Sequence, residues 1–159
     1  MNFPILSSLI LLPLIGSVFI FFNRSTEKNK TIKYVSIFIT FSNFLLSLYL
    51  WYIFDKSISD FQFIEDREWI SGLINYKVGI DGISILFVVL TAFITPLCVI
   101  SVISTIKYRL KDFLIAILIM ESLMIGVFCS LDLVVFYLFF EGGLIPMFLI
   151  IGIWGGERR

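Results

Sequence analysis

The chain has 159 residues, of which 59% are apolar and 15% are charged, and its 12 basic residues balance its 12 acidic residues to a net charge of zero. A soluble domain is typically about 45–50% apolar and about 25% charged, and the mean hydropathy of this chain is high, at +1.03. The sequence therefore predicts an integral membrane protein, and it argues against nucleic-acid binding because no basic excess exists to neutralise phosphates.

Histidine is absent from the sequence, and the two cysteines are Cys98 and Cys129. Histidine-ligated metals and histidine acid–base chemistry are therefore excluded for this sequence. Both cysteines lie inside apolar runs, so we expect small core side chains rather than a disulfide or a metal site.

A membrane-spanning helix needs about 20 predominantly apolar residues, because the hydrocarbon core is about 30 Å thick and each residue rises about 1.5 Å. Five stretches of the sequence meet this requirement. The predicted spans cover residues 3–22, 34–54, 83–106, 113–130 and 133–153. The first stretch lacks the basic start and the small-residue cleavage site of a signal peptide, so we interpret it as a span. We expect an all-α membrane protein with a single domain over 1–159.

The basic residues predict the orientation of these spans. Nine of the twelve lie on one side, in the loops after the first and third spans and at the end of the chain: Arg24, Lys28, Lys30, Lys33, Lys107, Arg109, Lys111, Arg158 and Arg159. The positive-inside rule places that side in the cytoplasm or matrix, with the amino terminus facing outward.

The segment 55–79 is the largest predicted piece outside the membrane. Phe61 and Phe63 alternate with polar neighbours, which is compatible with a short strand or an interfacial hairpin. We favour a solvated loop with two aromatic anchors. In the GIDGIS sequence at 79–84, Asp81 is expected to cap the third span by accepting hydrogen bonds from free backbone N–H groups.

Two carboxylates lie inside predicted spans, Glu121 in the fourth and Glu141 in the fifth. A charge at the bilayer centre costs at least about 2.5–3.5 kcal/mol, so such residues are rarely incidental. Each glutamate lies eight residues from the start of its span, at 113 and 133, which corresponds to a depth of about 12 Å. Because the two spans are antiparallel neighbours, we expect the two carboxylates at similar heights.

Each glutamate has two interpretations, a titrating group or a neutral carboxyl that joins helices by hydrogen bonds. Gly142 and Gly143 follow Glu141, and Pro146 removes the backbone bond to the Gly142 carbonyl. A loosened helix beside an acid suits water or a mobile cation, which favours a function for Glu141. For Glu121, in an unbroken helix, both interpretations stay open.

No lysine or arginine lies inside a predicted span, so a cation that pairs with these acids has to come from outside this sequence. Asp132, at the outer end of the fifth span, is expected to start that helix rather than to relay protons.

Four segments resemble the family of antiporter-like subunit 4 (bacterial subunit M) of NADH–quinone oxidoreductase, respiratory complex I. They are FQFIEDREWI at 61–70, YKVGIDGIS at 76–84, MESLMIGVF at 120–128 and LDLVVFYLFFEGGLIPMFLIIGIWGG at 131–156. The resemblance implies the N-terminal part of a 14-helix antiporter-like fold in a membrane arm that couples NADH oxidation and quinone reduction to proton translocation. It aligns Glu141 with a fifth-helix glutamate that pairs with a seventh-helix lysine, and it leaves Glu121 as a further candidate relay group.

The same resemblance implies that this chain holds no redox centre and that FMN, iron–sulfur clusters, NADH and quinone belong to partner subunits. The implied partners are other membrane-arm subunits, lipids and the polypeptide that supplies the helices after Arg159, whether a longer chain or a separate one. The 18 phenylalanines, abundant isoleucine and the lack of a presequence favour the mitochondrial inner membrane over a bacterial plasma membrane.

Two other functions stay open. One is a subunit of a multisubunit sodium/proton antiporter or of a membrane-bound hydrogenase. The other is a structural membrane subunit that does not pump, in which Glu141 joins helices.

Overall fold

The computed structural model describes residues 4–22, 30–58, 60–70 and 74–155. Over these residues it contains five helices and one two-stranded sheet. In chain order they are α1 (Ile5–Phe22), α2 (Lys30–Ile53), β1 (Gln62–Ile70), β2 (Ile74–Ile80), α3 (Ser84–Thr105), α4 (Leu110–Cys129) and α5 (Leu133–Trp154). All five helices are long and apolar enough to cross a membrane, so the predicted all-α membrane fold is confirmed.

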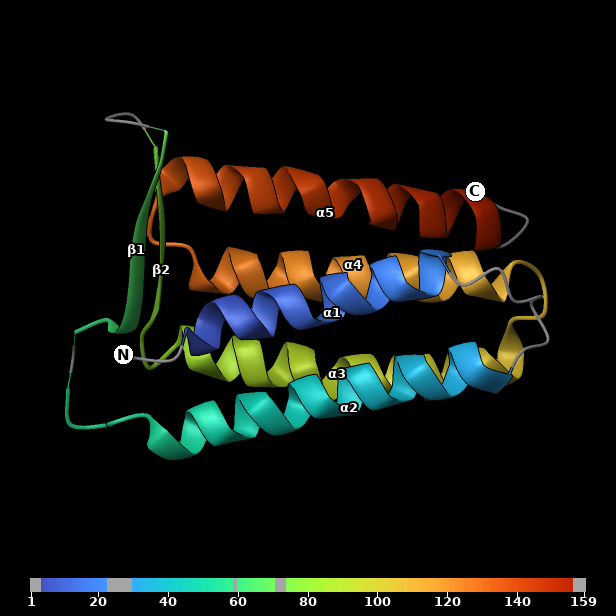
Figure 1. The fold of residues 1–159 in the computed structure, drawn as a ribbon, viewed down its shortest axis with the longest axis horizontal. Coiled ribbons are helices and arrows are strands. Elements are labelled where there is room, and N and C mark those ends of the chain that lie inside the picture. Colours follow the sequence, from blue (N-terminus) through green and yellow to red (C-terminus); the bar gives the residue numbers. More distant parts are fainter. Residues whose placement is uncertain (1–3, 23–29, 59, 71–73, 156–159) are drawn as a thin grey trace.

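The five helices lie side by side with their axes along one direction, and the β1–β2 hairpin lies across one end of the bundle (Figure 1). Helix α4 packs against α1, α3 and α5, whereas α2 packs mainly against α3 and α1. Leu114, Leu118 and Ile125 of α4 are fully buried, while the buried residues of α5 are Val135 and Pro146. The core is therefore centred on α4, and α5 is an edge helix that leaves most of its surface unpacked.

Two aspartates begin helices as predicted. The Asp81 carboxylate accepts hydrogen bonds from the backbone N–H groups of Ile83, at 3.2 Å, and Ser84, at 2.7 Å, just before α3. The hydrogen bonds from Ser84 stabilise the charged carboxylate and lower the pKa of Asp81. The Asp132 carboxylate accepts from the N–H groups of Val134 and Val135 at 2.8 and 3.1 Å. Both side chains supply partners to N–H groups that the first helical turn leaves free.

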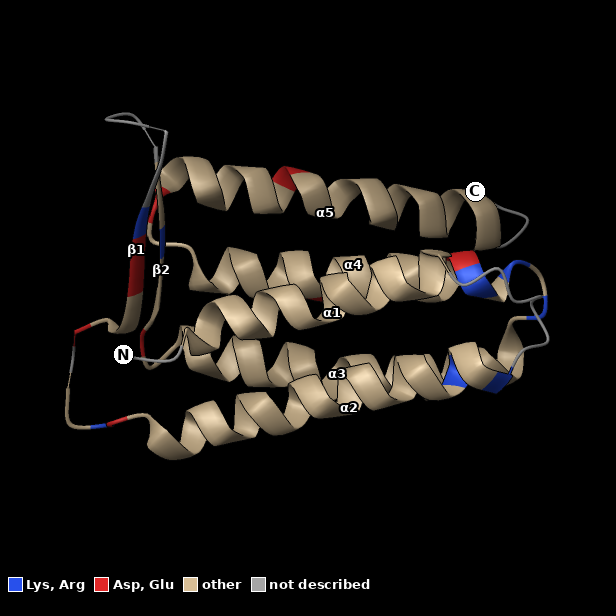
Figure 2. Cartoon of the chain, viewed as in Figure 1, with Lys and Arg blue, Asp and Glu red and all other residues tan. Residues whose placement is uncertain are grey.

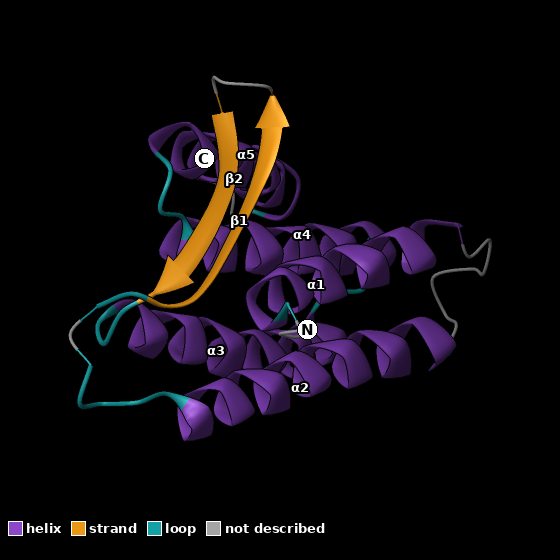
Figure 3. Ribbon diagram, turned by 60° about the vertical axis from the view of Figure 1, so that its left-hand side comes forward, coloured by secondary structure: helices purple, strands orange, loops and turns teal. Residues whose placement is uncertain are grey.

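The outer segment 55–79 is not the solvated loop that we favoured. Strands β1 and β2 pair antiparallel, with Glu65 opposite Val78 and Arg67 opposite Tyr76 (Figure 3). Val78 and Ile80 of β2 are fully buried against the helix ends. The apolar face of the hairpin therefore packs on the helix ends. An isolated two-stranded hairpin is only marginally stable in water, and packing of this kind stabilises it.

The hairpin is also joined to the bundle by backbone contacts. The Leu131 N–H, between α4 and α5, donates to the Lys77 carbonyl at 2.9 Å. Of the two predicted aromatic anchors, Phe63 is half-buried and packs against the core, whereas Phe61 is exposed. Phe63 has a positive φ of 55° at an irregularity in the strand pairing, so the strand bends where this ring turns toward the helices.

Most of the described basic residues lie at one end of the bundle, and the hairpin end carries most of the described acidic residues together with a few basic ones. Figure 2 shows lysines and arginines gathered at the end opposite the hairpin, where the α1–α2 and α3–α4 connections lie. The described members of this group are Lys30, Lys33, Lys107, Arg109 and Lys111. The predicted separation of charge is therefore present in the described residues, and the assignment of the basic end to the cytoplasm or matrix stays a prediction.

Candidate functional site

Glu121 lies in the middle of α4 and is almost completely buried. Its side chain is 2% exposed, and Asn43 of α2, which is 0% exposed, donates a hydrogen bond from Nδ2 to Glu121 Oε1 at 2.9 Å. The other polar atom of each side chain, Glu121 Oε2 and Asn43 Oδ1, is buried without a hydrogen-bond partner among the described residues. This pair therefore joins α2 directly to α4 through two polar groups that are only half satisfied.

Asn43 belongs to a polar stripe on the buried face of α2. The stripe consists of Ser36, Thr40, Asn43 and Ser47, all of them fully buried. Each hydroxyl in it donates to a carbonyl three or four residues earlier in the same helix, which is the usual way for such side chains to be satisfied inside a helix. Asn43 is the member whose bond reaches another helix. Our sequence interpretation missed it, although polar residues recurring every three or four positions in an apolar span are a visible signal.

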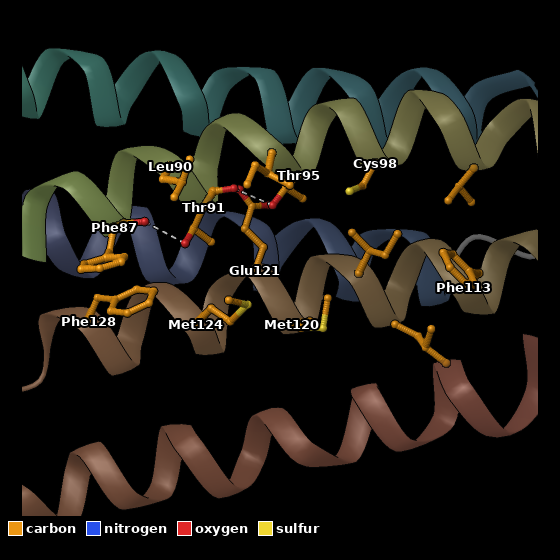
Figure 4. Close-up of a pocket in the computed structure, with 14 residues that line it drawn as sticks. Phe87, Leu90, Thr91, Thr95, Cys98, Phe113, Met120, Glu121, Met124 and Phe128 are labelled. Atoms are coloured by element: carbon orange, nitrogen blue, oxygen red, sulfur yellow. Dashed lines mark hydrogen bonds between the residues drawn. The ribbon is translucent and has the colours of Figure 1, made fainter. Parts of the chain in front are cut away.

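Glu121 also borders a cavity of about 410 Å³ between α3, α4 and α5. Figure 4 shows Thr91 and Thr95 of α3 on one side of this cavity and Met120 and Met124 of α4 on the other. The two threonine hydroxyls donate to the carbonyls of Phe87 and Thr91, at 2.8 and 2.9 Å. The cavity is thus mainly apolar, and among the described residues that line it Glu121 is the acidic one.

The two cysteines have different environments. Cys129 is fully buried in the core, as expected, whereas Cys98 is exposed and lines the same cavity. The expectation of a core position is therefore wrong for Cys98. Over the described residues, no three His, Cys, Asp or Glu side chains lie together as a potential metal site.

Glu141 lies at a similar height to Glu121 but on a different surface. Glu141 is eight residues after the start of α5 and Glu121 eight before the end of α4, which is about 12 Å from the hairpin end in each case. Glu121 faces the core, whereas Glu141 is exposed on the edge helix and interacts with the Tyr137 hydroxyl one turn earlier. The structure therefore confirms the similar heights but does not bring the two carboxylates together.

The helix around Glu141 is continuous. Helix α5 runs through Pro146, which is buried, to Trp154. Gly142 faces α4, where a Cβ atom would meet Leu123 at 3.4 Å, whereas a Cβ atom at Gly143 would have open space. The predicted loosening is therefore limited to the backbone bond that proline cannot make.

The fold and the two glutamates define a membrane protein that crosses the bilayer several times and carries carboxyl groups at mid-membrane height. The chain matches no protein-family model. It is 56% identical over 131 residues to NADH-quinone oxidoreductase subunit M of Rhodobacter capsulatus, and 46% identical over 155 residues to NADH-ubiquinone oxidoreductase chain 4 of Marchantia polymorpha. Subunit M of Rickettsia prowazekii is 43% identical over 162 residues.

These three matches cover 82%, 97% and 100% of this chain but 25%, 31% and 33% of the relatives. The chain thus spans about a quarter to a third of the length of the curated relatives it matches. It is homologous to the subunit M and chain 4 proteins, as the sequence segments indicated. A solved structure of the membrane-bound sulfane sulfur reductase, an archaeal respiratory membrane complex, has the same fold, with a TM-score of 0.72 at 20% identity over 90% of this chain and 22% of that one.

Proposed function

We propose that this chain is part of a membrane-arm subunit of NADH:ubiquinone oxidoreductase and that it contributes to proton translocation coupled to electron transport. Glu141 is the principal proton-translocating residue, and Glu121 is a second relay group. The observation that carries the proposal is the position of Glu141, an exposed carboxyl group at the middle of an apolar helix that packs against the bundle on one side only.

A carboxylate in that position requires a partner. Facing lipid, its charge would be costly at mid-membrane depth. The described parts of the spanning helices offer no cation near it, because Lys30 and Lys33 of α2 and Lys111 of α4 lie in the first turns of their helices at the basic end. A lysine or arginine on a further helix packed against α5 would stabilise the charged form. Movement of that cation away would favour proton uptake by Glu141, so the pair would couple a conformational change to a proton.

In this proposal the NADH:ubiquinone reductase activity belongs to the assembled complex. FMN, the iron–sulfur clusters, NADH and quinone bind to partner subunits, and this chain contacts other membrane-arm subunits and lipids. We place the complex in the mitochondrial inner membrane because of the phenylalanine and isoleucine content of the chain. The bacterial plasma membrane is the alternative, because relatives of both the quinone and the ubiquinone type match the chain.

The test is Glu141→Gln in the full-length subunit, assembled in its complex. Glutamine keeps the size and hydrogen bonding of the side chain but cannot titrate. We expect normal assembly, seen by native electrophoresis. Quinone reductase activity and proton uptake into sealed vesicles should fall by about a hundredfold or more, in the range of lost acid–base catalysis. Asp66→Asn is the control and should leave both unchanged, because it removes a carboxylate that forms an exposed ion pair with Lys77 in the hairpin.

The outcomes separate the open functions. Full activity and pumping in the Glu141→Gln variant would support a structural subunit in which Glu141 only joins helices. Transport that depends on sodium rather than on NADH oxidation would support the antiporter alternative.

A further inference from the structure

The Asn43–Glu121 pair contains the two buried side-chain atoms that lack a partner in the described residues, Asn43 Oδ1 and Glu121 Oε2. Both atoms can only accept hydrogen bonds when Glu121 is ionised. The two side chains are already joined by the hydrogen bond from Asn43 Nδ2 to Glu121 Oε1 at 2.9 Å. Buried polar atoms in folded proteins are nearly always hydrogen-bonded. Two unpartnered acceptors on two side chains that are already hydrogen-bonded to each other therefore indicate a missing donor.

A single proton supplies that donor. A protonated carboxyl group has one O–H donor besides its acceptor oxygen, and a carboxamide has both a donor and an acceptor. With a proton on Oε2, the acid and the amide can form two antiparallel hydrogen bonds, Nδ2–H to Oε1 and Oε2–H to Oδ1. The first bond is present, and the second would form if the protonated Oε2 approached Oδ1.

We propose that Glu121 and Asn43 form an intramembrane proton-binding site, in which Glu121 holds a proton on Oε2 and donates it to Asn43 Oδ1. This inference deepens the proposed function, on which it rests for its link to pumping, by giving the second relay group a partner and a resting state. Asn43 is a positioning residue, because it acts through the carboxyl group of Glu121.

The surroundings of Glu121 favour the neutral acid. The described elements packed against α4 bring no cation to its carboxyl group: α1 has no charged residue, and the lysines of α2 lie ten or more residues before Asn43. The other titratable groups on these elements are Cys98 of α3, which lines the same cavity, Tyr34, Tyr49 and Tyr52 of α2, Tyr137 and Glu141 of α5, and Tyr76 and Lys77 of β2. An unpaired charge buried in an apolar bundle is strongly unfavourable, whereas a hydrogen-bonded neutral acid is not.

The pair keeps one bond in either protonation state. When Glu121 releases its proton, to a water molecule that enters the adjoining cavity, the Nδ2–H to Oε1 bond remains and becomes charge-assisted. When Glu121 takes the proton back, the second bond forms again. The contact between α2 and α4 therefore persists while the charge on Glu121 changes. The hydroxyl groups of the α2 stripe could not maintain this contact, because they donate to carbonyls of their own helix.

The test is infrared difference spectroscopy of the full-length subunit in its assembled complex, recorded in membranes perfused at different pH values. A protonated Glu121 has a carboxylic acid C=O band, which is assigned by its loss in Glu121→Gln. Asn43→Leu removes the amide while keeping a similar volume, so the band should move to higher frequency. Asn43→Gln, which retains a carboxamide, should move it back toward the parent position.

Thr95→Val is the matched control, because its hydroxyl borders the same cavity but donates within α3, and it should leave the band in place. Absence of a Glu121-dependent acid band at neutral pH, or an unchanged band in Asn43→Leu, would overturn the inference. The Glu121-dependent acid band is measured without any change at position 43, so this part of the test holds even if Asn43→Leu fails to assemble. This measurement does not depend on enzyme activity. If the band shifts as expected in Asn43→Leu but Glu141→Gln pumps fully, the proposed function is refuted and the proton-binding site at Glu121 is still supported.

Discussion

Replacing Glu65 with alanine should loosen the first turn of α1, although the two are far apart in the sequence. Glu65 lies on β1, and its carboxylate accepts hydrogen bonds from the backbone N–H of Leu6 at 3.0 Å and from that of Ser7 at 3.3 Å to each oxygen. The Ser7 hydroxyl also donates to Glu65 and lies 3.2 Å from the Tyr76 hydroxyl on β2. The hairpin thus provides the cap of a helix from another part of the chain.

The expected loss of stability in Glu65→Ala follows from the backbone N–H groups that the carboxylate satisfies. The first N–H groups of a helix have no partner within it, and Leu6 is fully buried, so water cannot easily take over from the carboxylate. Loss of a helix cap costs about 1–2 kcal/mol, and the negative charge also interacts favourably with the helix dipole. A change of one or two kcal/mol corresponds to about a fivefold to thirtyfold change in a local opening equilibrium.

Hydrogen–deuterium exchange measured by mass spectrometry on the full-length protein in membranes would detect this change. Peptides that include Leu6 and Ser7 should exchange about five to thirty times faster in Glu65→Ala. Asp66→Ala is the matched control, because Asp66 lies next to Glu65 but forms only an exposed ion pair with Lys77 at 3.7 Å, a type of contact that contributes little. Equal exchange in the parent and in Glu65→Ala would refute the idea that the hairpin caps α1.

Two further exchanges test the helix ends and the packing between helices. Asp81→Asn should lower the melting temperature above about pH 4, and this difference should disappear as the pH falls through the pKa of Asp81 in the folded protein. Hydrogen bonds from Ser84 lower that pKa below its ordinary value of 3.8, so the charged carboxylate stabilises the fold fully above the unfolded-state pKa and loses this contribution below the folded-state pKa. Melting curves of the two proteins against pH should therefore converge in acid, and a constant gap would contradict this account. Gly126→Ala should destabilise the protein by about 1–3 kcal/mol, because the new Cβ atom would lie 2.7 Å from the Phe139 ring between α4 and α5, whereas Gly143→Ala, where nothing lies within 4 Å, should not.

The spans could be predicted from the sequence because their signal is local. Twenty apolar residues in a row indicate a membrane helix whatever they pack against, and aspartates before apolar runs indicate helix starts, as Asp81 and Asp132 show. The hairpin could not be predicted in the same way. Val78 and Ile80 are buried only because the ends of the bundle lie beneath them, and that surface is assembled from segments distant in the sequence.

The candidate site was also predictable only where its signal is local in the sequence. Sequence alone identifies both intramembrane glutamates, since a charge in an apolar run is visible without any structure. It does not tell which one faces the core, because that depends on how α4 and α5 are rotated about their axes. The role of Asn43 was missed for a related reason. The polar stripe of α2 is visible in the sequence, but the acid that Asn43 contacts lies 78 residues away.

The different environments of the two glutamates suit different roles in one path. Glu121 has a neutral partner within the bundle, so the described helices can pack around it without any additional cation, provided that it carries its proton. Glu141 has a tyrosine neighbour on its own helix and otherwise an open surface, so its charge depends on whatever helix packs there. In the proposed function, a proton at Glu121 depends on Asn43 of α2, whereas one at Glu141 depends on the helix that packs against α5. In that proposal, this arrangement would place the conformational control at Glu141 and a stationary proton store at Glu121, so we expect the glutamine exchange to affect pumping more strongly at Glu141 than at Glu121.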